Sequence, residues 1–114
     1  MLIGGEMLDF KINKNTIKSY IRKLKEKGVK EVKIFLVSHF NGMIDCEEEI
    51  NETRIIPLEE IEEDIKKDYV YIYLDTEKKL IEVRAFATFH YYIIDEKFEE
   101  LKKVALAKFV AKNL

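Results

Sequence analysis

The sequence predicts a single α+β domain in which strands and helices follow one another in the order β-α-β-β-α-β-β-α. Two patterns of hydrophobic spacing lead to this prediction. Apolar residues alternate with polar ones along several short segments, as in strands, and recur every three or four residues along three others, as in helices. The chain has 114 residues, 47% hydrophobic and 37% charged, which is the balance expected of one folded, hydrated domain.

The first predicted elements are a strand over residues 6–12 and a helix that ends near Gly28. Asn13, Asn15 and Thr16 follow the strand and offer side-chain oxygens that can cap a helix. Glycine readily adopts the left-handed conformation that terminates helices. The helix carries one hydrophobic stripe at the spacing i, i+3, i+4 and i+7, made of Ile17, Tyr20, Ile21 and Leu24.

A β-hairpin is predicted next. Residues 32–40 are mostly β-branched or aromatic, and Asn41-Gly42 is the pair that favours a two-residue type I′ turn. The return strand would cover residues 43–50, and its three consecutive glutamates predict that it lies at a sheet edge. The register of this tight turn pairs Val37 with Cys46, Ser38 with Asp45, and His39 with Ile44.

The second half of the chain is predicted as helix, strand, strand, helix. Pro57 suits the first turn of a helix, and strands over residues 70–74 and 80–92 follow, joined by a turn. Asp95 then caps the last helix. The predicted buried stripes are Leu58, Ile61 and Ile65 in the first of these helices, and Phe98, Leu101, Ala105 and Phe109 in the last.

The first six predicted elements have the order of a ferredoxin-like (split βαβ) core, in which two helices cover one face of an antiparallel sheet. The final strand and helix would be C-terminal additions. A five-stranded mixed sheet of another topology is the alternative, because local patterns do not encode strand order. Many unrelated activities occur on such folds, so function has to be argued from individual side chains.

His39 and Cys46 are the first candidates for chemistry. In the predicted register they share one face about 7 Å apart between backbones, and an imidazole beside a thiol can make it a nucleophile. The simpler interpretation is a core-facing side of the hairpin, where a cysteine behaves as a small hydrophobic residue. A triad of Ser38, Asp45 and His39 is excluded, because successive side chains of a strand point to opposite faces.

Asp75 and the triplet Glu82-Val83-Arg84 loosely resemble the strand pattern of restriction-endonuclease-like nucleases. That pattern requires a lysine at the position of Arg84 and a further acidic residue on a matching strand. We therefore expect Asp75 to be a turn residue and Glu82 and Arg84 to form a solvated strand face. No phosphate loop, dinucleotide fingerprint, zinc or calcium motif occurs. The sequence therefore predicts a protein that is not an enzyme and that uses no metal or cofactor.

Charge is distributed unevenly along the chain, although the formal net charge is only −2. Residues 11–33 contain nine basic and two acidic residues, a net charge of +7, whereas residues 45–68 contain eleven acidic and three basic residues, a net charge of −8. Within the acidic segment, Glu62 and Glu63 are spaced to pair with Lys66 and Lys67 four positions later. Such segregation predicts a strongly dipolar molecule.

The leading hypothesis is a small interaction or regulatory protein that presents its acidic segment to a basic protein partner. An inhibitor that mimics the charge of nucleic acid would be one such protein. The predicted acidic surface consists of Asp45, Glu47, Glu49, Glu52, Glu59, Glu62 and Glu63. The alternative is a nucleic-acid-binding module that uses the basic segment. Its predicted phosphate contacts are Lys14, Lys18, Arg22 and Lys25. Tyr20 is the aromatic residue of that segment and belongs to the buried stripe, which leaves base stacking unsupported.

A homodimer is predicted from the aromatic residues of the second hairpin. Tyr71 and Tyr73 alternate with aliphatic residues along one strand. Phe86 follows Ala85 in the other strand and points to the opposite face from it, so these three aromatic residues would form an exposed surface. The last helix is the alternative cover for that face. No membrane-spanning segment is predicted, and the single cysteine with no recognisable signal peptide points to the cytoplasm, or to the host cytoplasm for a virus-encoded protein. The Lys/Glu-rich composition with only three arginines is typical of thermophiles, archaeal ones and their viruses included.

Overall fold

The computed structural model describes residues 9–39, 49–85 and 89–113 of the chain and has an α+β architecture. Six strands form one antiparallel sheet, and three α-helices and a short 3₁₀ helix accompany it. The elements in chain order are β1 (Asp9–Ile12), α1 (Lys14–Glu26), β2 (Glu31–His39), β3 (Glu49–Pro57), α2 (Leu58–Ile65), β4 (Val70–Asp75), β5 (Leu80–Ala85), β6 (Phe89–Ile93), η1 (Glu96–Phe98) and α3 (Glu99–Lys112).

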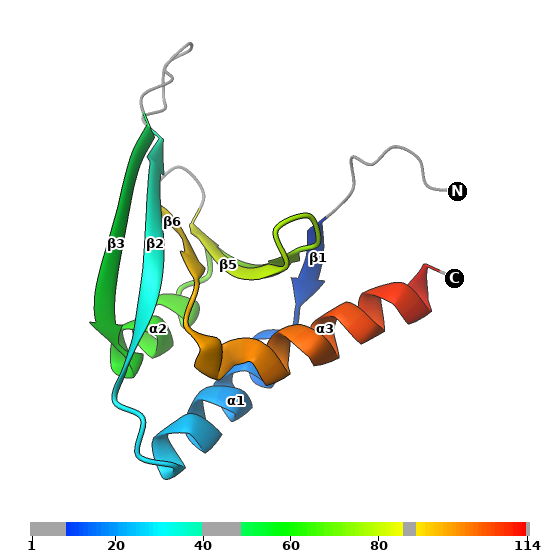
Figure 1. Cartoon of the computed structure of the whole chain (residues 1–114), viewed down its shortest axis with the longest axis horizontal. Coiled ribbons are helices and arrows are strands. Elements are labelled where there is room, and N and C mark those ends of the chain that lie inside the picture. The colour runs from blue at the N-terminus through cyan, green and yellow to red at the C-terminus, as the bar shows by residue number, and fades with distance from the viewer. Residues whose placement is uncertain (1–8, 40–48, 86–88, 114) are drawn as a thin grey trace.

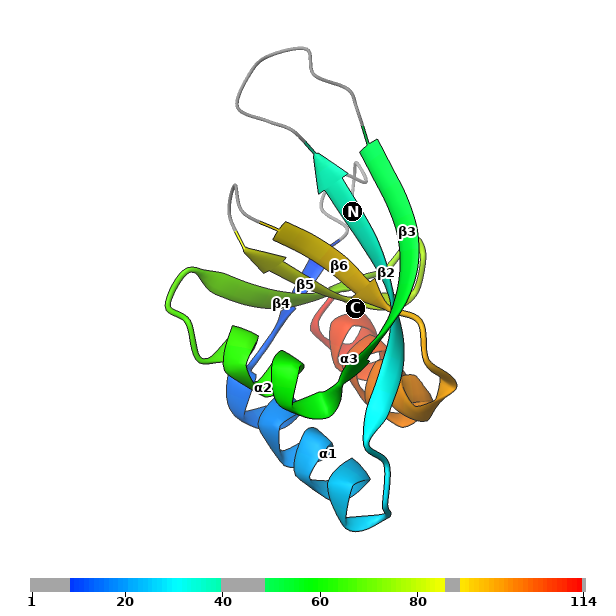
Figure 2. The same ribbon diagram turned by 90° about the vertical axis from the view of Figure 1, so that its left-hand side faces the viewer.

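The strands lie in the order β1-β4-β5-β6-β2-β3, and every neighbouring pair is antiparallel. β1 and β2 therefore run in the same direction, and α1 connects them past the three strands that separate them. The helices gather on one side of the sheet (Figures 1 and 2), and Figure 1 shows the sheet bending around its other side. We call the side without helices the open face.

The core lies between the sheet and the helices. Strand side chains alternate between this layer and the open face, as the pleat requires. The strands contribute Ile12, Val32, Ile34, Ile56, Val70, Ile72, Leu74, Ile81, Val83, Ala85, Tyr91 and Ile93 to the core, and the helices contribute Ile17, Ile21, Leu24, Leu58, Ile61, Ile65, Phe98, Leu101 and Ala105. The described side chains on the open face include Lys11, Phe35, Tyr71, Tyr73, Asp75, Glu82, Arg84, His90 and Tyr92.

The predicted helices are confirmed, and so are their buried stripes except at Tyr20 and Phe109, which are only half-buried. The side chain of Asn13 accepts a hydrogen bond from the backbone N–H of Asn15, and Gly28 follows α1 with a φ of 91°. Asp95 caps η1 by accepting from the backbone N–H of Lys97. None of the helices that the structure describes is long and apolar enough to cross a membrane.

The ferredoxin-like arrangement is not confirmed. A ferredoxin-like sheet needs the first and third strands side by side at its centre, whereas β1 and β3 lie at opposite edges. The predicted single strand over residues 80–92 is also wrong, because β5 and β6 are two strands that pair with one another. Residues 86–88 lie between the two strands, outside the described residues, and contain no glycine, proline or asparagine, so the sequence has no signal that would divide the predicted strand.

The predicted register of the first hairpin is wrong as well. Val37 pairs with Asn51 and His39 with Glu49, instead of Cys46 and Ile44. The tight-turn register would place Asn51 opposite Val32, whereas the observed register places Ile56 there and buries it. Burial of an apolar side chain therefore outweighs the preference of the turn residues. β3 is an edge strand, as predicted for the return strand.

Candidate functional site

A buried polar cluster lies on the open face, at the middle of the sheet. The Glu82 side chain is only 1% exposed, and its carboxylate receives hydrogen bonds from Arg84 Nε at 3.0 Å and Nη2 at 3.1 Å. His90 Nε2 lies 2.6 Å from Glu82 Oε2. The strand register explains the burial, because Tyr73 and Tyr92 flank Glu82 on the two neighbouring strands. The predicted solvated strand face is therefore wrong for Glu82.

The electrostatics of this cluster keep Glu82 ionised. Burial raises the pKa of its carboxyl, but the contact with His90 and the charges of His90 and Arg84 outweigh this and hold the pKa below its ordinary value. The Arg84 guanidinium also lies 4.5 Å from the centroid of the Tyr73 ring. The carboxylate is thus occupied by two basic neighbours, and no group of three metal-ligating side chains occurs in the described part of the chain.

Asp75 is a turn residue, as predicted. Its Oδ1 accepts hydrogen bonds from the backbone N–H groups of Glu77 at 3.0 Å and Lys78 at 2.9 Å, which shape the turn between β4 and β5. Burial raises the pKa of the Asp75 carboxyl. These hydrogen bonds and the charge of Lys78 lower the pKa by more than burial raises it, so it lies below its ordinary value. Asp75 therefore serves the turn and offers no free carboxylate for chemistry.

The predicted phosphate contacts lie on one face of α1. Lys14, Lys18, Arg22 and Lys25 are spaced to share that face. Lys25 is tied to α2 through Glu62 at 2.7 Å, and Lys14 Nζ donates to the Lys67 carbonyl at 2.8 Å. Within the described residues, no carboxylate lies within 4.0 Å of Lys18 or Arg22, so these two exposed cations are available to a ligand.

Tyr71 lies at the N-terminal end of this basic face. The sequence did not predict that Tyr71 and the basic residues of α1 lie close together. The side chain of Tyr71 is among the exposed large hydrophobic ones, at 39%. Two ammonium groups lie over its ring, Lys11 Nζ at 4.3 Å and Lys14 Nζ at 5.7 Å from the centroid. Lys11, Asn13, Lys14 and Tyr71 line one surface hollow. We call this group the Tyr71 site. Two segments that are distant in the sequence build it, residues 11–14 and Tyr71 of β4, so no local sequence pattern indicates it.

The predicted acidic surface is extensively ion-paired where the structure describes it. Glu52 lies 2.9 Å from Arg54, Glu59 3.6 Å and Glu62 2.7 Å from Lys25, and Glu63 3.2 Å from Lys66. The expected pairs of Glu62 with Lys66 and Glu63 with Lys67 are wrong. Glu62 pairs with Lys25 of α1, Lys66 pairs with Glu63, and Lys67 pairs with Asp64. Asp45 and Glu47 lie outside the described residues, and Glu49 begins β3.

The remaining predicted sites are only partly described. Cys46, the Asn41-Gly42 pair and Phe86 lie outside the described residues. Of the predicted dimer surface, Tyr71 is exposed and Tyr73 is half-buried beneath Arg84. The last helix does not cover Tyr71 and Tyr73, because α3 lies on the opposite side of the sheet (Figure 2).

Comparison with known proteins found no matching family model, no matching curated protein and no matching solved structure. Function therefore has to be argued from the geometry of the chain itself.

Proposed function

We propose that the protein binds single-stranded nucleic acid, with the basic face of α1 holding phosphates and Tyr71 stacking on a base. The observation that carries this proposal is the Tyr71 site, where an exposed aromatic ring stands among lysines at the end of a row of cations. Proteins that bind single strands combine a basic track for the backbone with aromatic side chains for the bases.

Electrostatics favour phosphates along α1. Lys14, Lys18, Arg22 and Lys25 occupy one helix face over a length of about 16 Å, since each residue of a helix rises about 1.5 Å. A polyanion would be attracted chiefly to Lys18 and Arg22, whose charges carry no ion pair within the described residues. The acidic residues of α2 stand beside the Lys25 end, which leaves the Tyr71 end as the more positive one.

Tyr71 supplies the exposed aromatic ring that the basic segment lacks. A base that stacks on the exposed ring would displace one of the two ammonium groups, and that group would then be free to contact the adjacent phosphate. Such stacking contributes about 1–3 kcal/mol per base. A duplex keeps its bases stacked on one another, so an aromatic contact of this kind favours single strands.

A salt titration with a labelled, unstructured oligothymidylate tests the proposal. Lys18, Arg22 and the ammonium group displaced from Tyr71 would make three phosphate contacts, which predict a slope of log K against log[salt] of about −2 on a single strand. The double variant Lys18→Glu/Arg22→Glu should weaken binding and reduce the slope by about 1.4, whereas Tyr71→Ala should weaken binding at least about fivefold and leave the slope unchanged.

Lys103→Glu is the matched control, because Lys103 is an exposed lysine of α3 that lies away from the Tyr71 site. It should bind as the unmodified protein does. A slope near zero for the unmodified protein would remove the nucleic-acid function. Equal losses in Lys103→Glu and in the α1 double variant would reduce the interaction to a general charge effect.

A basic protein partner at the acidic segment is the second candidate. The position of β3 at the sheet edge favours it, because edge strands offer backbone groups that an incoming segment can pair with. Glu59→Lys/Glu63→Lys should then abolish capture of the partner and leave oligothymidylate binding intact. Capture that survives this charge reversal would exclude the acidic segment.

A further inference from the structure

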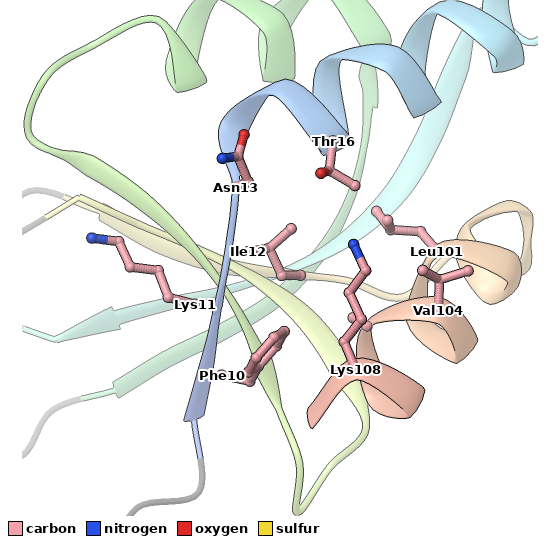
Figure 3. A pocket seen from close by; sticks show the side chains of 9 residues that line it. Phe10, Lys11, Ile12, Asn13, Thr16, Leu101, Val104 and Lys108 are labelled. Carbon is pink, nitrogen blue, oxygen red and sulfur yellow. The ribbon is translucent and has the colours of Figure 1, made fainter. Parts of the chain in front are cut away.

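A hydrophobic groove lies between α3 and the segment formed by β1 and α1, on the helical side of the molecule. Figure 3 shows its narrower end, where Phe10 and Ile12 of β1 face Leu101 and Val104 of α3, while Lys11 points away. The wider end lies between α1 and α3 and is lined by Ser19, Tyr20, Lys23, Leu24, Lys27 and Glu100. Thr16, Leu101 and Val104 line both hollows, so the two hollows adjoin along these side chains, and we call them together the groove.

The apolar residues at the floor of the groove, Ile12, Leu24 and Leu101, are nearly buried at 5%, 5% and 3% exposed, and only their edges face the hollow. The volume of the groove is about 140 Å³ at the narrow end and about 510 Å³ at the wide end. Val104 lies at the junction and remains 46% exposed. An apolar surface inside a hollow is a typical binding site, because a ligand there removes much more apolar area from water than it would on a flat surface.

The charges around the groove are mostly positive. Lys23 and Lys27 stand at the wide end, and in Figure 3 the side chain of Lys108 extends toward the space between Ile12 and Leu101. Glu100 is the acidic residue that lines the groove. In the described part of the chain, none of these three lysines has a carboxylate within 4.0 Å, whereas Lys102 of the same helix is paired with Glu99.

We propose that this groove binds an amphipathic anion, an unbranched aliphatic chain that carries a carboxylate. The chain would lie along Ile12, Leu101 and Val104 into the narrow end, and the carboxylate would be held by Lys23 and Lys27 at the wide end. The methylene stem of Lys108 would lie over the chain. The apolar floor and the positive rim together select this class over a neutral lipid or a small inorganic anion.

Calorimetric titration with octanoate, decanoate and dodecanoate below their micelle concentrations tests the proposal. Affinity should rise about fourfold for each added methylene. Lys23→Glu/Lys27→Glu should lower dodecanoate affinity at least tenfold and leave decanol binding unchanged, because decanol has no charge. Affinity that does not depend on chain length would overturn the proposal.

Val104→Asp and Val110→Asp form a matched pair, because both valines are 46% exposed on α3 and only Val104 lines the groove. Val104→Asp should lower dodecanoate affinity at least tenfold, and Val110→Asp should not. Equal losses would mean nonspecific adsorption. Light scattering provides a second way to overturn the proposal. If the unmodified protein is a dimer that binds no alkanoate, and Val104→Asp makes it monomeric, then a second copy of the chain fills the groove. Tyr71→Ala should not alter alkanoate binding, so this site and the Tyr71 site fail independently.

Discussion

Replacing Glu82 by glutamine keeps the size of the side chain but removes the charge at the centre of the open face. Glu82 is 1% exposed, and both Arg84 and His90 contact its carboxylate. Breaking a buried ion pair by removing one partner costs about 3–5 kcal/mol. Here the Arg84 side chain is 38% exposed, so water can solvate the remaining cation and the cost should be smaller. We expect a loss of about 2 kcal/mol, which corresponds to a fall in Tm of about 10 °C for a domain of this size.

Urea unfolding followed by circular dichroism at several pH values measures this loss. The folded-state pKa of Glu82 lies below the ordinary value of 4.5, so the stability that its charge contributes is fully present above that value and disappears as the pH falls through the folded-state pKa. The difference between the unmodified protein and Glu82→Gln should therefore shrink as the pH falls below the ordinary carboxyl value of 4.5.

Glu77→Gln is the control for a carboxylate without such partners, because Glu77 is exposed in the turn between β4 and β5. It should change the free energy of unfolding by less than about 0.5 kcal/mol. Adding Arg84→Met to Glu82→Gln should recover part of the loss, since the guanidinium that has lost its carboxylate partner is then removed as well. Our reasoning would be refuted if Glu82→Gln were as stable as the unmodified protein at pH 7, or if the difference were the same at pH 3.

Three further predictions concern the core, a helix end and self-association. Tyr91→Phe removes the hydroxyl that donates to Asp64 Oδ2 at 2.8 Å, and it should lower the free energy of unfolding in urea by about 1–2 kcal/mol. An unchanged urea midpoint would show that this buried hydrogen bond does not stabilise the fold. Gly28→Val should lower the free energy of unfolding by about 1–2 kcal/mol, because Gly28 has a φ of 91° that a β-branched residue rarely adopts. Gly28→Asn should lose less stability, since asparagine tolerates this conformation better. Equal stability of the two variants would contradict the role of backbone strain. Without nucleic acid, light scattering at micromolar concentration should give twice the 13.6 kDa chain mass, and Tyr73→Glu should give one chain mass. Oligothymidylate should dissociate the dimer, because both would occupy Tyr71. A monomeric unmodified protein would exclude the predicted dimer.

Local patterns in the sequence were sufficient to predict the helices. The stripe of Ile17, Ile21 and Leu24 repeats within one segment, and the caps at Asn13 and Asp95 act on backbone groups two residues away. The same holds for Asp75, whose hydrogen bonds stay within the turn that follows it. Interactions of such short range depend on neighbouring residues alone, and they survive any change in the order of the strands.

Strand order, register and the partners of charged side chains were decided only by the tertiary structure. The tight-turn register of the first hairpin gave way to one that buries Ile56, and Glu62 pairs with Lys25 of another helix instead of Lys66 of its own. Tyr71 acquires Lys11 only because β1 pairs with β4 at the far edge of the sheet. Burial of apolar surface is summed over the whole chain, so the arrangement that buries most determines which distant residues meet, and no short stretch of sequence contains that sum.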